Sequence, residues 1–169
     1  LKRLTLRHLL TMASGHGQSC LLSAQRAQLT TKDWARFYLQ QPLIYEPGER
    51  FVYDTGDTYI ASAMVQRACG ETLLSYGMER LFDPLGIALP RWDACPMGVN
   101  IGGAGLYLTL ADTAKLGLLY LNDGVWDGKQ LVPAAWVQMA TRKHIETTDM
   151  PPEHDGHYGY GFQFWRGQH

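Results

Sequence analysis

The sequence has few cysteines, no excess of charge of either sign and no long apolar run. Cys20, Cys69 and Cys95 are too few and too widely spaced for a disulfide framework or a C-x-x-C zinc site, so we expect structural roles for them and no metal site. Lys and Arg number 15 and Asp and Glu 16, without a basic run, so nucleic acid is not an expected partner. No apolar run approaches the roughly 18 residues of a membrane-spanning helix, so no membrane span is expected in this segment.

Both ends of the chain read as internal sequence. Leu1 is not a methionine, and His169 follows closely on an aromatic, glycine-bearing segment, 158–165, that we predict to be a sheet strand. We therefore expect an internal fragment with a single partial domain. Its helical subdomain would cover about 1–145, and the start of a returning sheet about 157–169. No compartment is predicted, because a signal peptide would lie upstream of this segment.

Capped helices joined by glycine-rich and proline-rich loops dominate the expected structure. The clearest helix is Leu110–Leu121, which follows a capping-box-like pair of Thr109 and Asp112 and ends before Asn122. Further helices are predicted at 5–12, 32–41, 58–68, from Thr72 to just before Asp83, and from Pro133 to about Thr141.

The most informative stretch is 47–57, because it sets one tyrosine on a turn between a short aromatic strand and a helix. Phe51–Tyr53 is β-prone, and Thr55–Asp57 can cap a helix that begins near Thr58. A side chain at such a corner is held firmly and faces open space. Tyr53 is therefore the candidate for chemistry, whereas Asp54 is interpreted as a solvated turn residue.

Five segments resemble, in order, motifs of the beta-lactamase-related serine hydrolases. This superfamily includes class C beta-lactamases, penicillin-binding DD-peptidases and related esterases and amidases. The segments are 4–16, similar to "TLRHLLTMTSG"; 47–70, similar to "PG-x-x-F-x-Y-S-N" and its helix; 81–87, similar to "LF-x-PLGI"; 102–117, similar to "GG-x-GL-x-x-T-x-x-D-x-x-K-x-G"; and 158–162, similar to "YGYGW".

This resemblance implies an α/β (α+β) beta-lactamase/transpeptidase-like fold, of which the chain covers mainly the helical subdomain. It also implies acyl transfer to water through a serine acyl-enzyme, with an ester, amide or beta-lactam as the small-molecule substrate and no cofactor or metal. In the family a serine of an S-x-x-K motif attacks a carbonyl, and the lysine and a tyrosine shuttle its proton. Tyr53 takes that tyrosine's place.

Other positions are implied as substrate contacts. The second motif reads Tyr-Asp-Thr where the family more often has Tyr-Ser-Asn, so Thr55 replaces an amide by a hydroxyl, which favours acyl transfer in general over beta-lactam hydrolysis. Thr55 is alternatively a helix N-cap. Trp92 follows the "PLGI" segment, where the family often has a tryptophan near the cleft. Gly102 and Gly103 line the cleft or, alternatively, form only a turn before the next helix.

No S-x-x-K occurs between Leu1 and His169, so we expect the nucleophile upstream and this fragment alone to be inactive. His154-Asp155-Gly156 matches the family's H-x-G motif but precedes the "YGYGW"-like segment, so the true third motif is expected beyond the chain. His154 and His157 have a spacing that a metal could use but no third ligand nearby, so a metal is not predicted there.

Two other classes of protein stay open. One is a non-catalytic binding or regulatory protein that keeps the scaffold with a degraded site. The other is a structural domain that binds a partner through its aromatic loops. A fragment that lacks its flanking segments should leave apolar surface uncovered.

Overall fold

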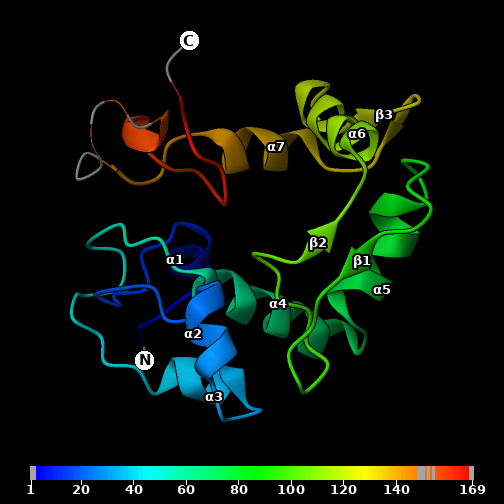
Figure 1. The fold of residues 1–169 in the computed structure, drawn as a ribbon. Helices are drawn as coiled ribbons and strands as arrows, with labels where there is room; N and C mark the ends of the chain where they lie inside the picture. Colours follow the sequence, from blue (N-terminus) through cyan, green and yellow to red (C-terminus); the bar gives the residue numbers. More distant parts are fainter. Residues whose placement is uncertain (1–2, 148–150, 152, 154, 168–169) are drawn as a thin grey trace.

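The computed structural model describes residues 3–147, 151, 153 and 155–167. Helices are the main regular elements, together with two small antiparallel strand pairs (Figure 1). The helices are α1 (Leu6–Leu10), α2 (Ser23–Gln28), α3 (Trp34–Leu39), α4 (Thr55–Cys69), α5 (Leu73–Gly77), α6 (Leu110–Leu121) and α7 (Ala134–Thr141), with a π-helical turn at Met78–Phe82 and a 3-10 turn at Asp155–Tyr158. The strands are β1 (Arg91–Trp92), β2 (Leu106–Tyr107), β3 (Val125–Trp126) and β4 (Lys129–Gln130).

Helix α4 is the central element, and it packs against α1, α3 and α5. It begins three residues earlier than predicted, because Asp54 rather than a later residue caps it. It ends at Gly70, whose φ of 75° is the left-handed conformation that glycine adopts most readily. Helix α4 has 15 residues, and no helix in the described part of the chain is both long and apolar enough to cross a membrane.

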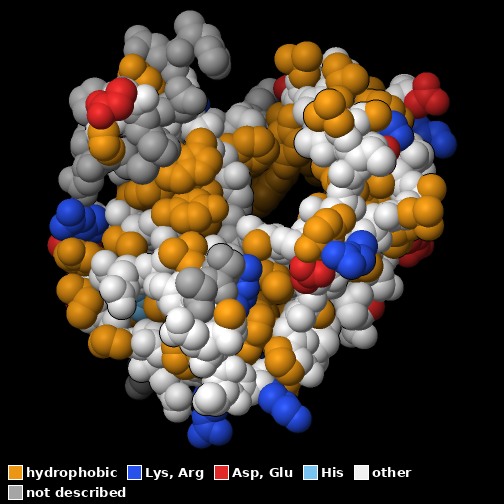
Figure 2. Space-filling view, in the orientation of Figure 1, with side chains coloured by type: hydrophobic (Ala, Val, Ile, Leu, Met, Phe, Trp, Pro, Cys, Tyr) orange, Lys and Arg blue, Asp and Glu red, His pale blue; other side chains and the backbone are white. Residues whose placement is uncertain are grey.

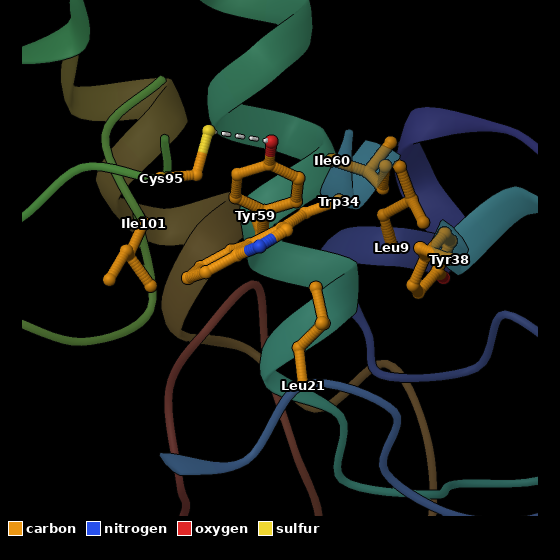
Figure 3. Close-up of a cluster of buried hydrophobic side chains, with 8 residues drawn as sticks. All are labelled: Leu9, Leu21, Trp34, Tyr38, Tyr59, Ile60, Cys95 and Ile101. Atoms are coloured by element: carbon orange, nitrogen blue, oxygen red, sulfur yellow. Dashed lines mark hydrogen bonds between the residues drawn. The ribbon is translucent and has the colours of Figure 1, made fainter. Parts of the chain in front are cut away.

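The first hydrophobic core joins α1, α3 and α4 to the loop that precedes β2. Figure 3 shows its eight buried side chains: Leu9, Leu21, Trp34, Tyr38, Tyr59, Ile60, Cys95 and Ile101. Trp34 lies beside Tyr59, with ring centroids 5.8 Å apart, and the Tyr59 hydroxyl donates to Cys95 Sγ at 3.3 Å. The burial of each large aromatic side chain contributes roughly 2–3 kcal/mol, so this core fixes α4 relative to its neighbours.

The second core lies between the π-helical turn and α6. Phe82, Leu85, Ile87 and Leu119 are its buried members. The predicted helix at Leu110–Leu121 is confirmed with the same ends, and Thr109 accepts the Asp112 amide proton as its N-cap. The helix predicted from Pro133 to about Thr141 is found as α7, and the β3–β4 hairpin precedes it.

Two predicted strands are wrong. Phe51–Tyr53 has no strand partner, and its backbone is held by one bond from the Val52 amide to the Met12 carbonyl. Residues 158–165 pair only at isolated bridges around a tight turn closed by the Gly161 amide and the Phe164 carbonyl. A strand needs a continuous partner, and neither segment has one within the described residues.

Candidate functional site

Tyr53 lies directly before α4 and stays accessible, with 40% of its surface exposed. Its ring stacks on Trp165, with centroids 5.4 Å apart and planes 23° apart. Phe51 packs against Tyr160 and Trp165, so the C-terminal segment braces the whole turn. The arrangement gives a tyrosine that is both accessible and held in place.

Asp54 is completely buried, so its interpretation as a solvated turn residue is wrong. Its Oδ1 accepts hydrogen bonds from the amides of Gly56 (2.8 Å) and Cys20 (2.9 Å) and from the Ser19 hydroxyl (3.1 Å). Its Oδ2 faces His16 Nδ1 at 3.4 Å. Burial alone would raise the pKa of Asp54, but the bonds from His16 and the two amides hold it below its ordinary value.

Asp57 is a second buried carboxyl on the first turn of α4. It accepts a short hydrogen bond from the Tyr38 hydroxyl. Burial, with the nearby Asp54 charge adding to it, raises the pKa of Asp57 to about 8, against the lowering effect of the Tyr38 bond. Asp57 is therefore mostly protonated at neutral pH, while Asp54 is ionised.

Thr55 is buried, and the helix N-cap is its neighbour Asp54, so the interpretation of Thr55 as the N-cap is wrong. The Thr55 methyl group lies against the backbone of Gly103: a Cβ on this glycine would stand 3.3 Å from Thr55 Cγ2 and 3.1 Å from Thr58 Cβ. Gly102 approaches α4 even more closely, because a Cβ there would stand 2.8 Å from the Thr58 carbonyl oxygen. The two glycines thus let the loop lie on α4.

An apolar cavity of about 620 Å³ opens beside these glycines. Figure 2 shows a hollow in the middle of this face with hydrophobic side chains around it. Trp92, Gly102 and Gly103 border the cavity together with side chains of α1, α4 and α7. Its polar wall residues already have partners: Thr58 donates to Gln163 (2.6 Å), Ser62 to the Asn100 carbonyl (2.7 Å) and Gln163 to the Leu10 carbonyl (3.1 Å). The cavity therefore suits an apolar occupant.

The structure brings Trp92, Gly102 and Gly103 to one cavity wall and Thr55 behind it, whereas Tyr53 does not line the cavity.

Sequence reasoning missed two features. Gln163 holds the C-terminal segment on α1 with a positive φ of 64°, which is uncommon for a residue other than glycine. The second is a cluster of His16, Cys20 and Asp54. Asp54 lies 34 positions after Cys20, so no spacing motif could have found the set of three. His154, of the H-x-G and metal interpretations, lies outside the described residues.

The comparison with family models identifies one family. The model of the family described as "Beta-lactamase" matches residues 1–168. A curated relative, lovastatin esterase of Penicillium rubens, is 34% identical over 92 residues, which are 50% of this chain and 23% of the esterase.

Two solved structures share the fold. The octameric penicillin-binding protein homologue from Pyrococcus abyssi aligns with a TM-score of 0.73 at 19% identity, over 95% of this chain and 42% of that one. Simvastatin synthase from Aspergillus terreus aligns with a TM-score of 0.58 at 24% identity, over 81% of this chain and 41% of that one. The predicted beta-lactamase/transpeptidase-like, α+β fold is confirmed. The chain spans less than half the length of each of these three relatives.

Proposed function

The chain belongs to the beta-lactamase family, and on that premise we propose that it is part of a serine hydrolase whose nucleophilic serine lies outside residues 1–169. The observation that carries the proposal is the position of Tyr53. The ring is accessible and stacked on Trp165, and the next residue is a buried helix cap. A proton-transfer group must be fixed in place and still reach the substrate, so the stacking and the exposure of Tyr53 support this role.

In the proposed reaction, the serine hydroxyl attacks the carbonyl carbon of an ester, amide or beta-lactam while Tyr53, as phenolate, takes its proton. The tetrahedral intermediate then collapses, and the leaving alcohol or amine takes that proton from Tyr53. Water attacks the resulting serine ester in the same way and releases the acid. A lysine of an S-x-x-K motif outside residues 1–169 would stabilise the phenolate.

Substrate contacts are proposed for Thr55, Trp92, Gly102 and Gly103. The segment that carries the serine would cover part of the apolar cavity. The space left beside Trp92 would take an apolar acyl group. Lovastatin esterase, a relative named for an esterase activity, favours esters over beta-lactams.

The test is Tyr53→Phe in the full-length protein, assayed on a nitrophenyl ester and a chromogenic cephalosporin. Loss of a general acid–base typically lowers kcat by 10²–10⁴-fold, so we expect a fall of at least about 100-fold with little change in KM. Tyr107→Phe is the matched control, because Tyr107 is also exposed but lies in the β1–β2 hairpin and donates to Asp93.

Covalent labelling decides the position of the nucleophile. A fluorophosphonate probe should modify a serine outside residues 1–169, and peptide mass spectrometry of the labelled protein would locate that serine. Absence of labelling, together with an inactive wild type, would favour the non-catalytic binding protein. A labelled serine within residues 1–169 would refute the proposal that the nucleophile lies outside them.

A further inference from the structure

Three possible metal ligands lie together at the N-terminal end of α4, which Asp54 caps. Asp54 and His16 are buried, and Cys20 is half-buried in the loop that follows α1. Their ligand atoms, one carboxylate oxygen, Nδ1 and Sγ, lie within 4.8 Å of one another. The resemblance to known motifs assigns none of these three residues a role. Asp54 occupies the position where the family more often has serine.

The distances from His16 to the other two residues are compatible with metal ligands. His16 Nδ1 lies 3.4 Å from Asp54 Oδ2 and 3.6 Å from Cys20 Sγ. Hydrogen bonds from nitrogen to oxygen ordinarily span about 2.7–3.2 Å. Zinc ligands stand about 2.0–2.3 Å from the ion, which sets neighbouring corners of a tetrahedron roughly 3.3–3.7 Å apart. Both measured separations lie in that range.

The surroundings hold the Asp54 carboxylate and the His16 ring in place. Asp54 Oδ1 is fully engaged by Ser19 and by the amides of Cys20 and Gly56, which leaves Oδ2 facing His16. The edge-to-face contact with Tyr38, with centroids 4.5 Å apart, fixes the His16 ring. His16 Nε2 has no hydrogen-bond partner among the described residues, so the polar contacts of the ring converge on Nδ1. Hydrogen bonds that orient a ligating carboxylate are typical of metal sites.

Space for a further ligand lies beside the cluster. A cavity of about 470 Å³ borders His16, Ser19 and Cys20. No Lys or Arg pairs with Asp54 in the part of the chain that the structure describes; its partners are the His16 imidazole, the Ser19 hydroxyl and the amides of Cys20 and Gly56. A divalent cation would neutralise this carboxylate and a Cys20 thiolate together.

We propose that His16, Cys20 and Asp54 bind Zn²⁺, with water from this cavity as the fourth ligand. Nitrogen, thiolate and carboxylate ligands in a tetrahedral arrangement favour zinc over Mg²⁺ or Ca²⁺, which prefer oxygen alone. The ion ties the loop after α1 to the N-terminus of α4, one residue from Tyr53. The proposal is independent of the hydrolase chemistry.

The test is metal binding by the full-length protein after dialysis against a chelator. We expect the dialysed protein to retain one equivalent of Zn²⁺. Co²⁺ bound in its place should give the visible absorption bands of a tetrahedral ion and a thiolate charge-transfer band. Cys20→Ala should abolish the charge-transfer band and weaken zinc binding, measured by competition with a chelating dye, by at least about tenfold. Cys69→Ala, which removes an exposed thiol elsewhere on α4, should change neither.

Asp54→Asn keeps a helix-capping side chain and should weaken binding similarly. Circular dichroism checks that each variant is folded, and half-buried Cys20 keeps the test usable if Asp54→Asn does not fold. Failure to retain zinc, or equal zinc affinity in wild type and Cys20→Ala, would overturn the proposal and leave the cluster as a hydrogen-bond network.

Discussion

Tyr53 stacks on Trp165 across 112 positions of sequence, with ring centroids 5.4 Å apart and planes 23° apart. The stacking couples the proposed proton-transfer group to the C-terminal segment, because Trp165 also contacts Phe51 and Tyr160. The position of the Tyr53 hydroxyl therefore depends on a residue that no motif connects with it.

Replacement of Trp165 tests this dependence. In the full-length protein, Trp165→Ala should lower kcat by about tenfold or more, because misplacement of a catalytic group by about 1 Å can cost a hundredfold. Trp165→Phe retains an aromatic face and should recover most of the rate. Steady-state hydrolysis of the nitrophenyl ester measures both, and circular dichroism checks the fold. Undiminished kcat in Trp165→Ala would show that the stacking does not position Tyr53.

Asp57 makes stability depend on pH. Its pKa is raised from 3.8 to about 8, so between these values the folded state holds a proton that the unfolded state lacks. The stabilisation is complete below the unfolded pKa and is lost as pH rises toward 8. As pH rises from 5 to 8, the free energy of unfolding of wild type should therefore fall by about 1–3 kcal/mol relative to that of Asp57→Asn.

Urea unfolding with a chelator present measures this difference. Tyr38→Phe is the control. It removes the hydrogen bond that lowers the pKa of Asp57 but keeps the buried carboxyl, so the decline with pH should persist. If wild type and Asp57→Asn have parallel pH profiles, Asp57 is not the group that titrates.

Alanine substitutions at Gly102 and Gly70 distinguish the cost of left-handed backbone strain from the cost of a steric clash. Their φ values are 77° and 75°, but a Cβ on Gly102 would stand 2.8 Å from the Thr58 carbonyl oxygen, whereas one on Gly70 meets nothing within 4 Å. Gly70→Ala should cost about 1 kcal/mol, the strain of left-handed alanine. Gly102→Ala should cost roughly 1–3 kcal/mol more, because α4 or the loop must move. Equal losses in urea unfolding would mean that the loop does not rest on α4.

The sequence predicts the local parts of the fold well. Capping residues and proline place α6 and α7, because Thr109 and Pro133 act on the backbone within one helical turn. The failures need long-range information. Phe51–Tyr53 has strand propensity but no partner strand, and the side chain of Asp54 is buried because Ser19 and Cys20 come to it from an earlier loop.

The candidate site likewise contains some residues that the sequence predicts and others that it does not. Tyr53, Trp92, Gly102 and Gly103 come from a family resemblance, and their roles stay predictions. The His16, Cys20 and Asp54 cluster has no counterpart in a sequence pattern, because its two parts are brought together only when the Asp54 cap closes on the loop after α1.

Met64 gives a direct test of whether another segment covers the apolar cavity. It lines the cavity on α4 and is 44% exposed in this chain. In a Cys69→Ala background, Met64→Cys should react quickly with a maleimide in the isolated chain and at least about tenfold more slowly in the full-length protein, where the serine-bearing segment would exclude the reagent. Leu89→Cys is the matched control, since Leu89 is 93% exposed and should react at equal rates in both. If Met64→Cys reacts equally fast in both proteins, the cavity stays open. The serine would then approach Tyr53 from another side, and the cavity would be left entirely to the substrate.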